Sequence, residues 1–356
     1  MAKVLIIGPK FHYFNTSVER AFSSLGYVTH VLSYDNPVHP YNWINKVRYK
    51  FAKDKLAFKR RSRQSFQPVA EAAFQQFLPD LVFVMNGDML MADTLLHWRG
   101  QKSEDPEPVV KPARVALWFF DSMTHIPLCE DNITAVDALF CYEQTDIPLI
   151  QQRYGVVAHF LPQAVDPSLY HTLSASPKSF DIVFAGDLVH SVKRRQVAQA
   201  IVSHYPHLRI RIWGEYKPWY KNLWHWLTRE RRDIYQNRNA TGAQLNHDYN
   251  ASRIVLNIHH EQQKDGANPK VYEISATGAY QICDVNPYIS QLFQHHEVGL
   301  YHIDDSLGSN RFDQLFRCID EALAHDKQPQ ALSAQAIVLH SHTFLARMQE
   351  VIAIIQ

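Results

Sequence analysis

The sequence predicts an α/β protein made of two doubly wound domains, each with a parallel sheet. At 356 residues the chain is too long for one ordinary compact core, so two domains of roughly 150 to 200 residues are expected. Short runs rich in Val, Ile, Leu and Phe alternate with amphipathic helical patterns, which is typical of strands buried on both faces. A polar, turn-rich stretch at residues 163–178 interrupts this alternation and indicates a hinge.

The first domain is expected over residues 1–170. Apolar runs predict strands at residues 3–8, 28–34, 80–85, 114–120, 138–142 and 159–161. A helix from about residue 16 has Val18, Ala21, Phe22 and Leu25 on one face, and Gly26 ends it. This order of strands and helices predicts a Rossmann-like domain.

The second domain is expected over residues 171–342. Its strands are predicted at residues 181–185, 208–213 and 280–283, with a helix at 193–203. Residues 251–259 read as the end of a helix that runs into a further strand. The amphipathic last helix, residues 343–356, is expected to pack back on the first domain. Two such domains would face each other across a cleft at the carboxyl ends of their strands, where ligands bind to open parallel sheets.

Composition excludes several classes of protein. The formal net charge of +1 gives no global attraction to nucleic acid. The four cysteines are far apart and form no CxxC pair, which argues against a disulfide framework or a zinc site. No apolar stretch approaches the ~20 residues of a membrane span, and the N-terminal apolar run is too short for a signal peptide. A cytoplasmic location is therefore expected.

Residues 264–284, KDGANPKVYEISATGAYQICD, combine the features of an anion site with two acids. Pro269 suits the first turn of a helix, where its missing N–H costs nothing, and Gly266 lies just upstream. Free N–H groups at a helix start bind phosphate. Asp265 would lie in the preceding loop and Glu273 on the second helical turn, where both could accept hydrogen bonds from sugar hydroxyls. The alternative is an ordinary Asp-Gly turn followed by a solvated glutamate.

The segment DGANPKVYEISATGAYQICD resembles the donor-binding segment of GT-B glycosyltransferases, whose retaining members carry a Glu-x7-Glu motif. More closely, the chain is similar to the CgeB-like glycosyltransferases, of the spore maturation protein B type. Four further segments match in order: ALWFFDS (116–122), YGVVAHFLPQAVDPSLYH (154–171), FDIVFAGDLVHSVKRR (180–195) and YNASRIVLNIH (249–259). The resemblance covers about residues 75–345. It implies the GT-B fold, a nucleotide-sugar donor as substrate and no separate cofactor.

The same resemblance implies roles for the donor-site residues. Glu273 matches the acid that binds the ribose hydroxyls, and Asp265 matches the acid near the donor sugar, with Asp in place of Glu. Backbone N–H groups for the sugar and the phosphates are expected from Gly266, Ala267 and Asn268.

The turn that begins at Gly186 corresponds to a Gly-Arg-Leu loop in related enzymes, but here Asp187 replaces the arginine. A departing nucleoside diphosphate needs cations if no metal is present. That charge is therefore expected from Lys193, Arg194 or Arg195, of which Arg194 is preferred; the alternative for each is a solvated helix start.

The sequence signals for recognition of the base and for chemistry at the acceptor are less specific. Tyr216 or Trp213, in WGEYKP, could stack on the base, or either could be a core aromatic. In the first domain, His12, Asp121 and His125 follow strands and are the candidates for an acid or base. An inverting enzyme needs such a base, whereas in a retaining enzyme the leaving phosphate can take the proton. The two acids, Asp265 and Glu273, favour a reaction that retains the anomeric configuration, but the sequence alone does not distinguish the two stereochemistries.

Two basic, aromatic runs remain, residues 45–63 and 216–232. Lys and Arg beside Trp or Phe are typical of segments that lie on anionic membranes. Solvated helical faces, or contacts with a polyanionic acceptor, are the alternatives. If the runs bind lipid, the protein would work at the inner face of the cell membrane.

The sequence thus predicts a metal-independent, nucleotide-sugar-dependent glycosyltransferase of bacterial polysaccharide biosynthesis, acting on a surface-glycan, lipid-linked or protein acceptor. A non-catalytic nucleotide-sugar or carbohydrate-binding partner of another glycosyltransferase is the alternative, because the positions of Asp187 and Asp265 are altered. A hydrolase or epimerase on the same fold is a weaker third reading. Nucleic acid is not an expected partner.

Overall fold

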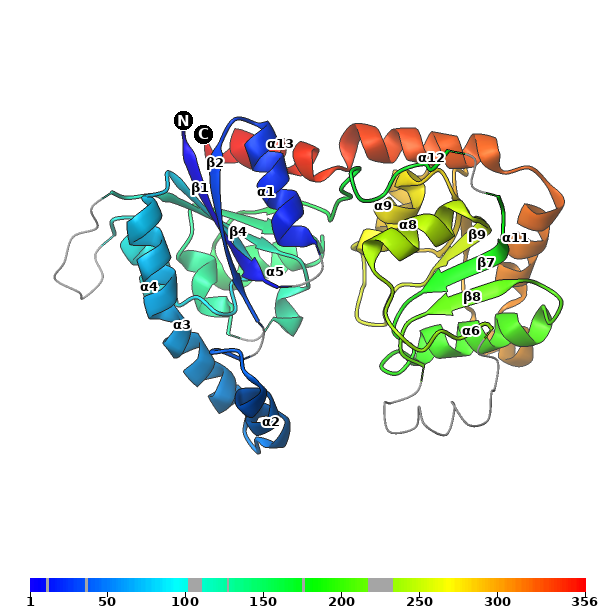
Figure 1. The fold of residues 1–356 in the computed structure, drawn as a ribbon, viewed down its shortest axis with the longest axis horizontal. Helices are drawn as coiled ribbons and strands as arrows, with labels where there is room; N and C mark the ends of the chain where they lie inside the picture. Colours follow the sequence, from blue (N-terminus) through cyan, green and yellow to red (C-terminus); the bar gives the residue numbers. More distant parts are fainter. Residues whose placement is uncertain (11–12, 36–37, 102–110, 127, 175–176, 217–232) are drawn as a thin grey trace. The chain divides into compact units, whose positions relative to one another are not determined.

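The computed structural model describes residues 1–10, 13–35, 38–101, 111–126, 128–174, 177–216 and 233–356. Within these ranges the chain divides into two compact units, each with its own sheet (Figure 1). Unit 1 comprises Met1–Pro162 and Phe344–Gln356, and unit 2 comprises Gln163–Thr343. The last helix therefore belongs to the same unit as the N-terminus, and the division falls at Pro162 where the sequence placed it at residue 170.

Unit 1 contains a six-stranded parallel sheet in the order β2-β1-β3-β4-β5-β6. The strands are β1 (Lys3–Pro9), β2 (Val28–Tyr34), β3 (Leu81–Met85), β4 (Arg114–Phe119), β5 (Ala138–Cys141) and β6 (Ala158–Phe160). The helices are α1 (Phe14–Ser24), α2 (Trp43–Phe51), α3 (Lys55–Phe77), α4 (Ala92–Trp98), α5 (Asp146–Tyr154) and α13 (Phe344–Ile355), with 3-10 turns η1 (Met123–His125) and η2 (Glu130–Thr134). All six predicted strands are present, with ends that differ by at most a residue or two.

Both faces of this sheet are covered, which explains why its strands are continuously apolar. Leu5 and its neighbours on one face belong to a core shared with Phe66 and Phe74 of α3. On the other face, Phe83 of β3 contacts Phe22 of α1, and Trp118 of β4 contacts Phe344 of α13. Helices α1 and α13 lie together in Figure 1. Successive side chains along each strand therefore pack into two separate layers, one on each face of the sheet.

Unit 2 contains a five-stranded parallel sheet in the order β11-β10-β9-β7-β8. The strands are β7 (Phe180–Ala185), β8 (Ile210–Trp213), β9 (Ser252–Asn257), β10 (Tyr280–Asp284) and β11 (Gly299–Tyr301). The helices are α6 (Val192–His204), α8 (Gly242–Asn250), α9 (Pro269–Ala276), α10 (Pro287–Leu292), α11 (Asp313–Ala324) and α12 (Gln328–Ser341), with the 3-10 turn η3 (Asp305–Asn310). The sequence analysis missed β11, which has only three residues and no apolar alternation to reveal it.

A close backbone approach fixes the loops at the carboxyl edge of this sheet. Gly214 follows β8 with φ of +124°, and a Cβ at this position would lie 1.9 Å from the carbonyl oxygen of Gly186. Gly186 follows β7, and its N–H donates to the Trp213 carbonyl oxygen at 2.9 Å. Only glycine fits at position 214, because any side chain would separate the two loops. These loops hold the candidate site.

Candidate functional site

The loop–helix boundary at Asn268 and Pro269 forms the centre of the candidate donor site in unit 2. Helix α9 begins at Pro269, as predicted, and Asn268 is its N-cap residue. The Asn268 side chain donates to Asn257 Oδ1 at 2.9 Å, and Asn257 donates to Gln281 Oε1 at 3.0 Å. These three buried amides join the start of α9 to the last residue of β9, Asn257, and through it to Gln281 of β10. The N-terminus of α9, with the backbone of Ala267, is therefore fixed at the carboxyl edge of the sheet.

Glu273 lies on the second turn of α9 and is only 5% exposed. A buried carboxylate needs partners, and Tyr170 provides one through a hydrogen bond from its hydroxyl. Burial, followed by the Glu273 charge, raises the pKa values of Tyr170 and Tyr249 far above the ordinary tyrosine value. The solvated alternative for Glu273 is therefore wrong: the side chain is buried and its carboxylate accepts a hydrogen bond from Tyr170.

Two cations lie near this helix start. Lys270, the second residue of α9, is one turn from Glu273 on the same helix face. Burial lowers the pKa of Lys270, the Glu273 charge opposes this, and the charge of Arg194 lowers the pKa further. Lys270 and Arg194 are thus within electrostatic reach of each other. Within the described part of the chain, the Lys270 ammonium makes no hydrogen bond or ion pair.

Arg194 is fixed through only one edge of its guanidinium. Its Nε donates to the Ile258 carbonyl oxygen at 2.9 Å, and Ser191, the N-cap of α6, accepts from its backbone N–H. No hydrogen bond from its two Nη atoms reaches another described residue. Gly186 leaves room for this side chain, because a Cβ there would already lie 3.4 Å from Arg194 Cδ. The guanidinium is thus positioned by backbone and retains donors for an anion.

The other two predicted cations are already engaged. The Lys193 ammonium lies 2.7 Å from Asp284 Oδ2. Arg195 donates from Nη1 to the carbonyl oxygens of Leu188 and Val189, at 2.9 and 3.2 Å. Of the three residues in the predicted VKRR run, Arg194 therefore has the most donor capacity left.

Asp187, which stands where related enzymes have arginine, organises its own turn. It accepts hydrogen bonds from the backbone N–H groups of Val189 and His190 and lies 2.6 Å from His190 Nδ1. Burial would raise the pKa of Asp187, but these hydrogen bonds outweigh it and lower the pKa. The loop is thus closed by an acid, Asp187, where related enzymes have a positive charge.

The remaining donor-site candidates are placed as follows. Asp265 and Gly266 lie in the loop before α9, and the Gly266 carbonyl oxygen accepts from Asn286 at 3.0 Å. Trp213 is a core residue, 4% exposed, and its indole N–H donates to Asp248 at 2.8 Å. Tyr216 stacks on Tyr235 with ring centroids 4.4 Å apart. Tyr216 therefore remains the better candidate for contact with a base.

A cluster of His259, Cys283 and Asp284 offers ligand atoms that lie within 4.8 Å of one another. Its chemistry does not suit a cation. Burial alone would raise the pKa of Asp284, but its contacts with His259 and Lys193 hold it well below the usual range. Burial raises the pKa of the Cys283 thiol, which disfavours the thiolate. With the Lys193 ammonium already on Asp284, a metal would meet a positive charge.

A hollow of about 430 Å³ lies beside this cluster. Its polar lining is paired internally: Lys193 with Asp284, and Glu261 with the Ser191 hydroxyl at 2.7 Å. Burial alone would raise the pKa of Glu261, but hydrogen bonds from the Lys193 backbone N–H, at 2.7 Å, and from the Ser191 hydroxyl hold it at about 2. Among the described residues, Arg194 and Lys270 have fewer hydrogen-bond and ion-pair partners than the charged groups that line this hollow.

In unit 1, Asp121 and His125 lie in the segment that follows β4. Asn86, with a left-handed φ of 61°, accepts from the Phe120 N–H at 2.9 Å and also hydrogen-bonds Asp121. Burial raises the pKa of Asp121, His125 and Asn86 oppose this, and the buried Glu143 adds to it. Because the Asp121 side chain is exposed, water will screen part of this effect. His12 lies outside the described residues.

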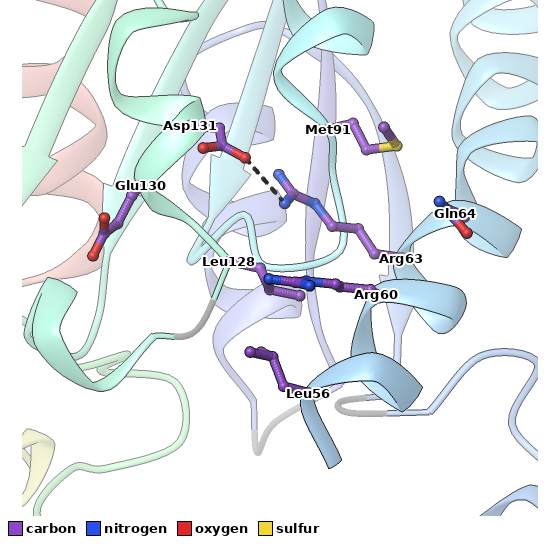
Figure 2. Close-up of a pocket in the computed structure, with 8 residues that line it drawn as sticks. All are labelled: Leu56, Arg60, Arg63, Gln64, Met91, Leu128, Glu130 and Asp131. Atoms are coloured by element: carbon purple, nitrogen blue, oxygen red, sulfur yellow. Dashed lines mark ion pairs between the residues drawn. The ribbon is translucent and has the colours of Figure 1, made fainter. Parts of the chain in front are cut away.

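A hollow of about 530 Å³ lies between α3 and the segments that follow β3 and β4 (Figure 2). It is lined by Leu56, Arg60, Arg63, Gln64, Met91, Leu128, Glu130 and Asp131. Arg63 is held by the Leu90 carbonyl oxygen at 2.7 Å and by Asn132 at 3.1 Å, and Asp131 lies 3.7 Å away. Arg60 and Leu128 both line the hollow (Figure 2), and Arg60 makes no hydrogen bond to another described residue. This mixture of charged, amide and apolar groups suits a polar, hydroxylated ligand.

Two Rossmann-like parallel-sheet units with this strand order define the class: the fold is GT-B. Residues 193–353 match the protein-family model described as Glycosyl transferase-like. This stretch covers α6 and α9 and therefore contains Arg194, Lys270 and Glu273. No curated protein matches the sequence.

Solved structures support the same fold over the whole chain. A sucrose-phosphate synthase from Thermosynechococcus elongatus has a TM-score of 0.68 at 10% identity, covering 99% of this chain and 98% of that one. A glycosyltransferase from Rickettsia africae has a TM-score of 0.65 at 11% identity, covering 99% and 97%. A trehalose-6-phosphate protein from E. coli, bound with UDP-2-fluoro glucose, has a TM-score of 0.64 at 11% identity, covering 100% and 99%. The predicted GT-B fold is confirmed.

Proposed function

We propose that the protein is a glycosyltransferase that moves a sugar from a nucleotide-sugar donor to a glycan, lipid-linked or protein acceptor, without a metal and with retention of configuration. The observation that carries this proposal is the pair of cations beside the start of α9. Lys270 lies in the first turn of α9, and the charge of Arg194 lowers its pKa. Neither the Lys270 ammonium nor the Arg194 Nη atoms make a hydrogen bond to another described residue. A diphosphate is the group that such a site would stabilise.

Each group would then have a definite task. Glu273 would accept hydrogen bonds from the ribose hydroxyls, and its burial would make those bonds strong. As the bond between the anomeric carbon and the diphosphate oxygen breaks, Arg194, Lys270 and the N–H groups of α9 would stabilise the charge that develops on the diphosphate. The acceptor oxygen forms the new bond to carbon, and its proton passes to the departing phosphate in the retaining route. Unit 1 would bind the acceptor, with Asp121 as the base only if the reaction inverts configuration.

Two observations support the donor class. The family model that matches residues 193–353 is glycosyltransferase-like, and one structure of the same fold holds UDP-2-fluoro glucose. The acceptor site is proposed at the hollow beside Arg60, in the segments that follow β3 and β4. A peripheral contact with an anionic membrane and a cytoplasmic location remain proposals, and residues 217–232 of the second basic run lie outside the described residues.

The experiment is a panel of nucleotide sugars, with release of nucleoside diphosphate as the readout, for wild type and Glu273→Gln. The glutamine keeps the size of the side chain, so loss of release would reflect the loss of the carboxylate. Glu297→Gln is the matched control, because Glu297 is equally buried in unit 2 but its carboxylate accepts from a loop N–H just before β11. We expect release by wild type and Glu297→Gln, and at least a tenfold loss in Glu273→Gln.

Two outcomes would contradict this proposal. Tight nucleotide binding without turnover, with every donor and acceptor offered, would favour the non-catalytic binding partner. Full activity in Glu273→Gln would remove the role given to this side chain. Retention would be tested by the anomeric configuration of the product, read by NMR.

A further inference from the structure

The helix α2 (Trp43–Phe51) carries four large apolar side chains that are exposed among the described residues of unit 1. None of its residues is buried, and Trp43 and Phe51 are 74% and 75% exposed. Ile44 and Val47, on the same helix, are exposed by 45% and 46%. Isolated exposed apolar residues are ordinary, but four on one short helix form a patch that requires a partner.

These four side chains share one face of the helix, and this face points away from the protein. At about 100° per residue, Trp43, Val47, Phe51 and Ile44 fall within an arc of about 100°. Tyr49 lies on the opposite side, where its ring contacts Phe58 of α3 at 5.6 Å between centroids. Helix α2 therefore packs on α3 through the Tyr49 side and leaves its apolar arc uncovered. In Figure 1, α2 lies at the end of α3 that is remote from the sheet.

The flanks of the apolar arc are positively charged. Lys46 and Lys50 border it on one side and Arg48 on the other, and the helix contains no acidic residue. The nearest acid along the chain, Asp54, accepts from the Ala57 N–H at 2.9 Å as the N-cap of α3. The helix itself thus carries one sign of charge.

We propose that α2 docks on an anionic lipid bilayer, with Trp43, Ile44, Val47 and Phe51 among the acyl chains and the flanking cations at the headgroups. An apolar arc bordered on both sides by Lys and Arg, with a tryptophan, matches the physical requirements of an interfacial helix. A second copy of the chain is a poorer occupant, because pairing two such faces would bring Lys46, Arg48 and Lys50 against the same cations. No helix in the described ranges is long and apolar enough to cross a bilayer, so contact through α2 would be peripheral. This inference does not depend on the proposed transferase activity.

The test is co-sedimentation of the full-length protein with vesicles of phosphatidylcholine alone and with a third of phosphatidylglycerol. Wild type is expected to bind the anionic vesicles at least tenfold more tightly, with binding that falls as salt rises. Trp43→Ser/Phe51→Ser is expected to reduce this binding at least tenfold, and Lys46→Glu/Lys50→Glu should do the same. Circular dichroism would verify that each variant is folded.

The matched control is Leu332→Ser/Leu339→Ser, which removes two exposed apolar side chains from α12 in unit 2 and should leave vesicle binding unchanged. Equal binding by wild type and Trp43→Ser/Phe51→Ser, or no preference for anionic vesicles, would overturn the proposal. Light scattering of the protein without lipid adds a separate criterion. A dimer that disappears in Trp43→Ser/Phe51→Ser would assign the face to a second copy and also overturn it.

Discussion

Lys270 offers the sharpest test of the donor site, because removing its charge should weaken ligand binding without weakening the fold. The substitution Lys270→Met keeps most of the length and apolar stem of the side chain. A hydrogen bond to a charged group contributes about 1.5–3 kcal/mol, and we take about 2 kcal/mol for one contact with a diphosphate. This corresponds to a Kd for UDP or GDP about 30-fold weaker in the variant.

The effect on stability should have the opposite sign or be absent. Burial and the Arg194 charge lower the pKa of Lys270, so the folded protein holds this proton less tightly than the unfolded chain does. The resulting cost to stability is present in full below the folded-state pKa and disappears above the ordinary lysine pKa. At neutral pH, Lys270→Met is therefore expected to unfold at the same or a higher temperature than wild type.

Isothermal titration calorimetry measures both the affinity and the proton uptake. A bound diphosphate should raise the pKa of Lys270, so wild type should take up protons on binding at a pH between the lowered folded-state pKa and the ordinary lysine pKa of about 10.4. Lys270→Met should show less uptake. Arg253→Met is the control, because it removes one exposed cation from the amino edge of the same sheet.

Unchanged diphosphate affinity in Lys270→Met would refute the assignment of this lysine to the diphosphate. A parallel loss of affinity in Arg253→Met would show that the effect reflects net charge alone. A large drop in the thermal stability of Lys270→Met would show that the ammonium already has a stabilising partner in the folded protein. It would therefore contradict the view that this charge is available to bind a ligand.

Two further predictions follow from the loops and from unit 1. Gly214→Ala should destabilise unit 2 by about 3 kcal/mol, from a left-handed φ and a collision with the Gly186 backbone, which corresponds to a fall of about 9 °C in Tm by calorimetry. Gly242→Ala, whose added Cβ would meet Tyr170 at an ordinary 3.5 Å, should leave Tm unchanged or slightly raised, and a similar fall in both variants would contradict the steric argument. If Asp121 takes the acceptor proton, Asp121→Asn should lower turnover about 100-fold or more without changing the Kd for the donor. Equal turnover in wild type and Asp121→Asn would show that Asp121 is not the base. Because burial raises the pKa of Asp121, the acidic limb of the wild-type rate profile should lie above the usual range for aspartate and be missing in Asp121→Asn.

The parallel strands and the start of α9 were predictable because their signals are local. Continuous apolar runs mark strands that are buried on both faces, and Pro269 marks the first turn of a helix whatever surrounds it. The strand β11 escaped detection, since three residues carry too little periodicity. Local pattern therefore located the edge of the sheet where the site lies.

The choice among the three cations of the VKRR run could not be made from the sequence. It depends on partners far along the chain, such as Asp284, which is 91 positions from Lys193. Lys270, directly after Pro269, was not predicted as a site residue. A cation in the first turn of a helix that is expected to bind an anion was the signal that could have identified it.

The route of the chain between the two units constrains how each can be made. Gln163–Thr343 is one continuous segment inserted between two parts of unit 1. The returning helix contributes Phe344 to a cluster with Phe14 and Trp118, and the buried Arg347 donates to the Pro162 carbonyl oxygen at 2.8 Å. A ribosome must therefore synthesise the whole of unit 2 before unit 1 can receive its final helix. Recombinant expression could take unit 2 as a single piece, whereas a fragment that stops at Pro162 would leave aromatic side chains of α1 and β4 without their cover.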